Sequence, residues 1–362
     1  MTGHQAAQEV MSDPRFAKNY RNWAAYQRGE IPEGHPLLGM VQLDNMLHSD
    51  GDDHGRLRGL ISKAFTPRRV RELRPQVQKL VGELLDGMEA GAGRADVKAD
   101  LATPLPMGVI CELFGIPEQD KLTVRELVSN VFSTVATPEE ALNTQQRVNE
   151  LFSGLIADKR ANPGEDLTSA LIGSRDENDR LSEVELLDTL WLMMAAGFET
   201  TMGALANTVR ALLTHRDQLD LVRSGECSWD AVIEEGLRWD TSVASLPFRF
   251  PTEDVEIGGR TLRAGEPVLV SFASANRDAE QHGDAAEDFD ITRKQKRHLS
   301  FGHGVHFCLG APLARMEMQV ALPALFERFP DLDLAADPAS IAPVASIFTN
   351  CPTELPVTFT PR

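Results

Sequence analysis

Apolar residues recur at helical spacing through residues 5–160, in segments that proline and glycine separate. One such segment, 73–88, follows Thr66-Pro67. Apolar positions three and four residues apart place their side chains on one helical face. The N-terminal half of the chain is therefore predicted to be mainly α-helical.

The longest helical pattern starts at Ser182, which forms a capping box with Glu185. The apolar spacing behind this box continues to about Leu213. A helix over 183–213 would be about 46 Å long at 1.5 Å per residue. Its middle, 186–198, is apolar nearly all round, which is typical of a helix buried in a core.

After this helix the pattern becomes mixed. Ser228 can cap a second helix that ends at Trp239, and Gly258-Gly259 indicates a hairpin over 255–262. A strand is predicted over 267–273 and a last helix over 312–328. With no internal repeat or long linker, we expect one domain spanning residues 1–362, mainly α with small β-sheets (α+β).

Charge and hydropathy narrow the functional classes. The net charge of −18 argues against a nucleic-acid partner, because that binding depends on basic clusters. The longest apolar run, 190–198, is far shorter than the ~20 residues that span a bilayer. The first residues lack the pattern of a signal peptide. We expect a soluble, cytoplasmic monomer.

One cysteine stands out among four at positions 111, 227, 308 and 351. Cys308 lies in the stretch Phe301-Gly302-His303-Gly304-Val305-His306-Phe307-Cys308-Leu309-Gly310. A thiolate at the start of a helix is stabilised by unpaired amides and the helix dipole. Glycines would let the loop approach a flat ligand closely. The alternative is a buried, unreactive cysteine, the usual role of a lone thiol.

A second candidate lies inside the predicted helix, where Gly197, Glu199 and Thr200 interrupt the apolar pattern. A threonine hydroxyl can bond to the carbonyl four residues earlier, so we expect the helix to widen here and open a groove. A carboxylate beside a hydroxyl could relay protons. The alternative is that these side chains only face other polar groups.

The spacing F-x-x-G-x-x-x-C-x-G resembles the haem-thiolate signature of the cytochrome P450 family, and Ala196–Thr200 resembles the family's A-G-x-[DE]-T motif. The resemblance covers nearly the whole chain from Ser12. It implies the P450 fold, with a long central helix over haem b (iron protoporphyrin IX) and a proximal Cys loop. Cys308 would be the iron ligand, Glu199 and Thr200 the catalytic pair that supports oxygen activation, and Phe301, Gly302 and Ala196 further haem contacts.

The resemblance also assigns polar residues around the haem. His54 and Arg58, spaced i,i+4 on one helical face, would bind the propionates with Arg249 and His306. Glu235 and Arg238 match the family's E-x-x-R element, which joins a third residue in a buried structural triad. We assign the third position to Arg293, with Arg277 as the alternative.

Family positions place five apolar residues around the substrate. The loop 28–46, rich in glycine and proline, would gate access, and the substrate is expected to be an apolar or amphipathic small molecule. The predicted pocket residues are Leu192, Ala196, Val243, Leu246 and Ile347.

These features predict a monooxygenase that receives two electrons from outside, because the chain has no flavin or iron–sulfur motif. The expected donors are a ferredoxin and a ferredoxin reductase that uses NAD(P)H. The basic run 293–297 would be the ferredoxin docking surface, or else a solvated patch. Two alternatives stay open: a peroxide-driven enzyme, and a haem-binding protein without turnover.

The chain departs from the family pattern at its start. Only twelve residues precede Asp13, where the family carries a first helix and strands of its larger sheet. We expect either a start codon assigned too late or a truncation, and an exposed sheet edge as a result.

Overall fold

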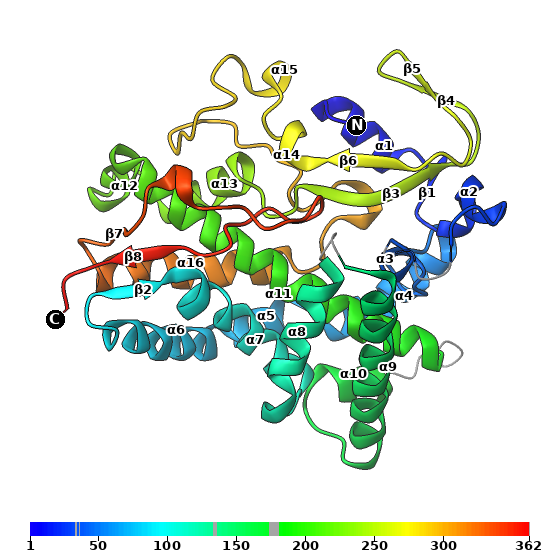
Figure 1. The fold of residues 1–362 in the computed structure, drawn as a ribbon, viewed down its shortest axis with the longest axis horizontal. Coiled ribbons are helices and arrows are strands. Elements are labelled where there is room, and N and C mark those ends of the chain that lie inside the picture. The colour runs from blue at the N-terminus through cyan, green and yellow to red at the C-terminus, as the bar shows by residue number, and fades with distance from the viewer. Residues whose placement is uncertain (33–34, 36, 133–135, 174–180, 362) are drawn as a thin grey trace.

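The computed structural model describes residues 1–32, 35, 37–132, 136–173 and 181–361. Helix α11 (Glu183–Thr214) crosses the middle of the molecule (Figure 1). Helices α6 to α10 lie on one side of it, and the sheet of β3 and β6 lies on the other. The predicted capping box is present, and α11 ends one residue beyond the expected position. The mainly α fold with small sheets is confirmed.

The helices follow the predicted segments closely, and the last one begins one residue early, at Ala311. The helices other than α11 are α1 (His4–Ser12), α2 (Ala24–Gln27), α3 (Leu38–Val41), α4 (Gly51–Ala64), α5 (Pro67–Glu72), α6 (Arg74–Glu89), α7 (Pro104–Phe114), α8 (Lys121–Phe132), α9 (Pro138–Ala161), α10 (Leu167–Gly173), α12 (Arg216–Arg223), α13 (Trp229–Trp239), α14 (Phe272–Ala275), α15 (Ala279–His282) and α16 (Ala311–Arg328), with a five-residue π-helical turn, η2 (Lys98–Ala102), before α7 and a 3-10 turn, η4 (Gly304–His306), before α16.

All the strand pairings in these sheets are antiparallel. The strands are β1 (Phe16–Ala17), β2 (Arg94–Asp96), β3 (Ser245–Pro251), β4 (Val255–Ile257), β5 (Arg260–Leu262), β6 (Val268–Ser271), β7 (Asp333–Leu334) and β8 (Pro356–Thr358), arranged as β1-β3-β6, β2-β8-β7 and the hairpin β4-β5. The hairpin is the predicted one. The strand expected over 267–273 is shorter, because the Ser271 side chain caps α14.

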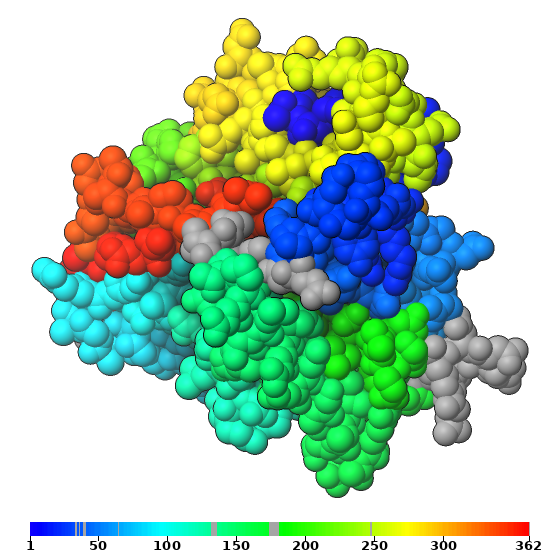
Figure 2. All heavy atoms as spheres, turned by 45° about the vertical axis from the view of Figure 1, so that its right-hand side comes forward, coloured from blue at the N-terminus to red at the C-terminus, as the bar shows by residue number. Residues whose placement is uncertain are grey.

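The first residues of the chain contact the rest of the structure at two points. The Met1 ammonium donates to the Leu269 carbonyl at 2.7 Å, and Ser271 donates its N–H to the Met1 carbonyl at 2.9 Å, so Met1 pairs with the edge of β6. Helix α1 packs on η4, where a Cβ at Gly304 would lie 3.1 Å from the Met11 carbonyl. In Figure 2, α1 is enclosed by the segments drawn in yellow, and the blue segment that carries α2 and α3 covers the face below them.

The interruption in α11 has a packing role. A Cβ at Gly197 would lie 2.7 Å from the Ile110 side chain, so the glycine allows α7 to pack closely against α11. The helix is continuous α-helix from Glu183 to Thr214, and the expected local widening is therefore wrong. Because Gly197 has no Cβ, the Ile110 side chain of α7 can approach α11 while the helix stays regular.

In the described part of the chain, no helix combines the length and hydrophobicity that crossing a bilayer requires.

Glu317 on α16 is an acid buried in this core. Its side chain is 1% exposed, and its Oε2 has no hydrogen-bond partner among the described residues. Burial raises the pKa of Glu317 to about 8. The folded state therefore keeps a proton that the unfolded state loses above its ordinary pKa, and the free energy of unfolding must fall as pH rises toward 8.

We predict that Glu317→Gln reduces this fall by roughly 3 kcal/mol between pH 5 and pH 8, because the amide does not titrate. Urea unfolding followed by circular dichroism at several pH values measures it. Glu327→Gln, on the last turn of the same helix, is the control. Equal pH slopes for wild type and Glu317→Gln would contradict the prediction.

Candidate functional site

A cavity lies between α11 and the loop that precedes α16, and together with the open solvent beside it the space measures about 1340 Å³. Leu192, Ala196 and Thr200 of α11 form one wall. The opposite wall is formed by this loop, residues 300–310, which we call the Cys loop. The two most distinctive parts of the sequence therefore face each other across one space.

Backbone hydrogen bonds shape the Cys loop around Cys308. The Cys308 N–H donates to the Phe301 carbonyl at 2.8 Å, and Gly302 and Gly304 adopt φ of +73° and +71°, a region that L side chains rarely adopt. Cys308 is exposed to the cavity. Burial raises the pKa of its thiol, and the N–H groups of Gly310 and Ala311 at the start of α16 oppose this effect. A thiolate here would be stabilised further by a bound cation.

Polar side chains fix the Cys loop to its neighbours. Asn276 accepts from the Leu299 N–H at 2.6 Å and donates to Ser300 Oγ at 2.9 Å. Ser300 Oγ in turn donates to the Leu237 carbonyl of α13 at 2.6 Å. Arg315 stacks over the Phe301 ring, with its guanidinium carbon 4.4 Å from the ring centroid. These contacts hold the start of the loop, where the Phe301 carbonyl accepts from the Cys308 N–H.

The structure brings Glu235, Arg238 and Arg293 together. Arg238 Nη2 lies 2.7 Å from Glu235 Oε1, with both side chains fully buried, and Arg293 Nε lies 3.5 Å from the same oxygen. Arg238 also donates to the carbonyls of Asn276, Ala286 and Asp288 at 2.7–3.0 Å. The competing Arg277 lies elsewhere, paired with Glu287 at 3.1 Å and stacked on Trp239.

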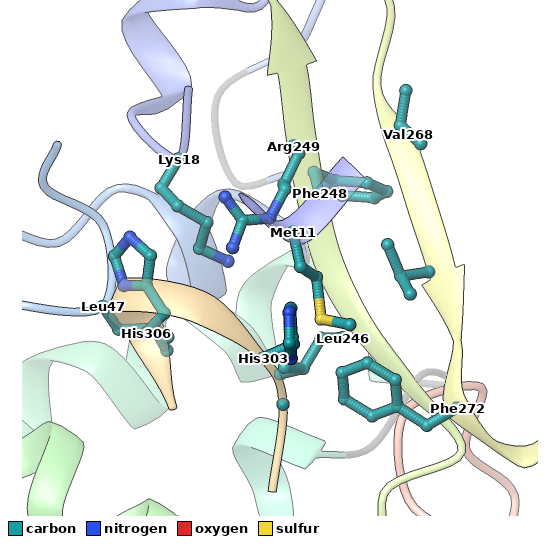
Figure 3. Close-up of a pocket in the computed structure, with 12 residues that line it drawn as sticks. Met11, Lys18, Leu47, Leu246, Phe248, Arg249, Val268, Phe272, His303 and His306 are labelled. Carbon is teal, nitrogen blue, oxygen red and sulfur yellow. The ribbon is translucent and has the colours of Figure 1, made fainter. Parts of the chain in front are cut away.

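The four predicted propionate ligands gather near one end of the cavity. His54 and His306 have ring centroids 4.2 Å apart, and Arg58 Nη2 donates to the Phe307 carbonyl at 2.7 Å. Arg249 extends from β3 toward His306, and Lys18 approaches from the segment after β1 (Figure 3). Lys18 is 4% exposed and was not predicted. A lone lysine after Phe16 carries no spacing signal that would have revealed it.

This cluster gathers basic side chains whose positive charges repel one another. Its members are Lys18, Arg249, His54, Arg58 and His306. Burial and the Arg249 charge lower the pKa of Lys18 to about 7, although the Asp50 carboxylate raises it. Burial lowers the pKa of Arg249 to about 10, and burial together with Lys18 and Arg249 lowers that of His306 to about 2. The cluster, which we call the cationic cradle, is suited to an anion.

These residues fit the haem that the sequence implies. The cradle would hold carboxylates, and the buried His54 Nε2 has no hydrogen-bond partner among the described residues, so it is available to one. Cys308 would supply the iron ligand from the Cys loop. Phe301, Gly302 and Ala196 line the space between them.

The acid and the alcohol lie on different sides of α11. The Thr200 hydroxyl lines the cavity and donates to the Ala196 carbonyl at 2.7 Å. Glu199 is buried and does not line the cavity described above. Burial raises the pKa of Glu199, while the charges of Lys98 and Arg125 lower it. Glu199 therefore lies near the charges of Lys98 on η2 and Arg125 on α8, and outside the lining of the cavity.

Four of the five predicted pocket residues line the cavity: Leu192, Ala196, Val243 and Leu246. The prediction for Ile347 is wrong, because its side chain is 52% exposed and lines none of the described cavities. The next residues along the chain, Phe348 and Thr349, point inward instead. The chain bends at Ile347 and Phe348, so the inward direction of the neighbouring residues does not extend to Ile347.

The predicted gating loop is described only in part. Leu43 and Met46 line the cavities, and residues 33, 34 and 36 lie outside the described residues. In the basic run, Lys294 and Arg297 are exposed, whereas Arg293 points inward to Glu235 and Lys296 donates to the Arg293 carbonyl. Part of this run is therefore structural.

Comparison with known proteins gives a consistent result. The family described as "Cytochrome P450" matches residues 229–337. The 2-hydroxy-5-methyl-1-naphthoate 7-hydroxylase of Streptomyces carzinostaticus is 46% identical over 98% of this chain and 87% of its own length. Cytochrome P450 monooxygenase PikC of Streptomyces venezuelae is 42% identical over 94% of this chain and 80% of its own. The structure of CYP154C4 from Streptomyces sp. W2061 superimposes with a TM-score of 0.95 at 43% identity, covering 99% of this chain and 88% of that one.

We predict that Lys18→Met accelerates haem release roughly tenfold, because one charged hydrogen bond to a propionate is lost. The haem-free protein should not lose stability, since the substitution also removes repulsion with Arg249. Haem transfer to apomyoglobin measures the first effect and urea unfolding the second. Lys79→Met, at an exposed lysine on α6, is the control. An unchanged release rate would contradict a role for Lys18 in the cradle.

Proposed function

The chain belongs to the cytochrome P450 family, and on that premise we propose that it is a haem b monooxygenase that hydroxylates or epoxidises an apolar small molecule, of the secondary-metabolite type. The observation that best supports this is the placement of Cys308 and Thr200 on opposite walls of one apolar cavity. The similarity to enzymes named as a hydroxylase and a monooxygenase also supports it.

The balance for hydroxylation is R–H + O₂ + 2 e⁻ + 2 H⁺ → R–OH + H₂O. When bound, the haem supplies the binding and reductive cleavage of dioxygen. Cys308 provides the thiolate. Its loop is held by Asn276, Ser300 and Arg315, so the sulfur is positioned before any ligand arrives.

Thr200 and Glu199 would deliver the two protons. Because the Thr200 hydroxyl donates to the Ala196 carbonyl, its lone pairs are left to accept a hydrogen bond from the cavity. Burial raises the pKa of Glu199, and in this proposal the carboxyl group passes protons from the side of Lys98 and Arg125 toward Thr200. The apolar walls exclude water from the reacting bond.

Electrons would come from a ferredoxin and its NAD(P)H-dependent reductase. Lys294 and Arg297 are exposed beside the Cys loop on an otherwise acidic protein, and they suit an acidic partner steered by charge. We propose that the enzyme acts as a monomer in this encounter.

The ferrous carbon-monoxide difference spectrum tests thiolate ligation. We expect a strongly red-shifted Soret band in the wild type and its loss in Cys308→Ser, because the hydroxyl is a poor iron ligand. Cys111→Ser and Cys351→Ser, at two thiols that are buried away from the Cys loop, should keep the band. A wild-type spectrum without the red shift would overturn the proposed function.

Thr200→Ala separates dioxygen-driven from peroxide-driven chemistry. We expect product formed per NADPH to fall at least tenfold, with hydrogen peroxide released instead, while peroxide-supported turnover is retained. Simultaneous assay of NADPH, peroxide and product measures this. Thr214→Ala, at the end of the same helix, is the control. Unchanged coupling in Thr200→Ala would favour the peroxide-driven alternative.

A further inference from the structure

The cavity above the Cys loop adjoins a second space at Thr200, which together with the open solvent beside it measures about 720 Å³. We call this space the side lobe. The two spaces share six lining residues, Leu47, Leu192, Ala196, Thr200, Val243 and Leu246, so they lie side by side. The far walls of the side lobe are almost wholly apolar, from Leu43, Val131, Trp191, Ala195 and Phe348.

Two hydroxyls and the imidazole of His48 interrupt these apolar walls. Ser245 on β3 is 8% exposed and Thr349 is 6% exposed, and both line the side lobe. They come from paired segments, because Val243 bridges to Thr349 and the Ser245 N–H donates to the Phe348 carbonyl at 3.3 Å. Backbone pairing therefore brings the two hydroxyls into the same part of the wall.

Neither hydroxyl makes a hydrogen bond to the described part of the chain. The backbone around them is already satisfied, since the Thr349 N–H donates to Ser346 Oγ at 3.2 Å. An unpaired polar group in an apolar site costs free energy that a ligand group of matching chemistry would restore. The pair is thus suited to a polar group on a bound molecule.

The chemistry of that group follows from the surrounding residues. A hydroxyl both donates and accepts, so Ser245 and Thr349 can bind either an alcohol or a carbonyl. No lysine, arginine, aspartate or glutamate lines the side lobe among the described residues, and His48 is the ionisable side chain that does. An amine would enter without a countercharge, and a carboxylate would first need a proton on the His48 imidazole, so both have a desolvation cost that a neutral group avoids. The group should be neutral.

We propose that the substrate is a compact apolar ring system with one neutral hydroxyl or carbonyl group, which Ser245 and Thr349 bind in the side lobe. The opposite end of the molecule then extends past Thr200 into the space that faces Cys308, and this end is the one oxidised. The inference rests on the proposed function and adds the substrate class and the two residues that orient it.

The test compares 2-naphthol with naphthalene, which has the same ring system without the hydroxyl. Dissociation constants come from the spin-state change in the haem absorption spectrum. We expect the wild type to bind 2-naphthol about tenfold more tightly, the value of one well-made buried hydrogen bond. In Ser245→Ala/Thr349→Val the two ligands should bind within about twofold of each other, while the naphthalene constant changes little.

Ser242→Ala is the matched control, because Ser242 is equally buried and lines the main cavity but not the side lobe. It should keep the tenfold preference. If the double variant does not incorporate haem, the two single variants replace it, and each should lose part of the preference. A double variant, or a pair of single variants, that keeps the full preference overturns the inference.

The ferrous carbon-monoxide spectrum separates this failure from failure of the proposed function. A red-shifted band together with an unaltered 2-naphthol preference in the variants would leave the monooxygenase assignment in place and reject the anchoring role. Absence of the band in the wild type would reject the function itself. Quenching of 2-naphthol fluorescence gives the binding constants without relying on the spin state.

Discussion

The buried ion pair between Glu235 and Arg238 is the interaction on which the position of the thiol depends. Both side chains are fully buried on α13, and Arg238 reaches three carbonyls between Asn276 and Asp288. Removing one partner of such a pair typically costs about 3–5 kcal/mol, because an uncompensated charge stays buried. Asn276, whose carbonyl accepts from Arg238, also holds the Leu299 N–H at the start of the Cys loop. The ion pair therefore fixes the frame in which Cys308 sits.

The cationic cradle differs from this ion pair because it gathers charges of the same sign. At the cationic cradle, burial and the charge of Arg249 lower the pKa of Lys18, and burial with both charges lowers that of His306, whereas Glu235 compensates Arg238 fully. One cluster is complete within the protein and holds the scaffold. The other has an excess of positive charge among the described residues, which would supply free energy for binding an anionic cofactor.

Local patterns were enough to predict much of this molecule. The capping box at Ser182 and Glu185 located the central helix to within one residue, and the glycines around Cys308 indicated a loop. Glu235 and Arg238 share a helical face at i,i+3 spacing, but their assignment came from the resemblance to the family's E-x-x-R element. The helix and the loop depend on neighbours in sequence, and so a single chain reveals them.

Features that depend on distant contacts could not be read in this way. Lys18 joins Arg249 only because β1 pairs with β3, a contact across more than 200 residues. Ile347 was assigned to the wall because nothing local fixes the register of its segment, whereas the bridge between Val243 and Thr349 does so in the fold. The role of Gly197 likewise becomes clear only when Ile110 of α7 packs beside it.

The contact between Gly304 and the Met11 carbonyl links the first helix of the chain to the loop that carries the sulfur. Because α1 bears on η4, an opening motion of α1 and a displacement of the Cys loop are one event rather than two. Any ligand that stabilises the loop must then, by thermodynamic linkage, also suppress the opening of α1. The protection of residues 4–12 against hydrogen exchange is thereby a remote measure of cofactor occupancy.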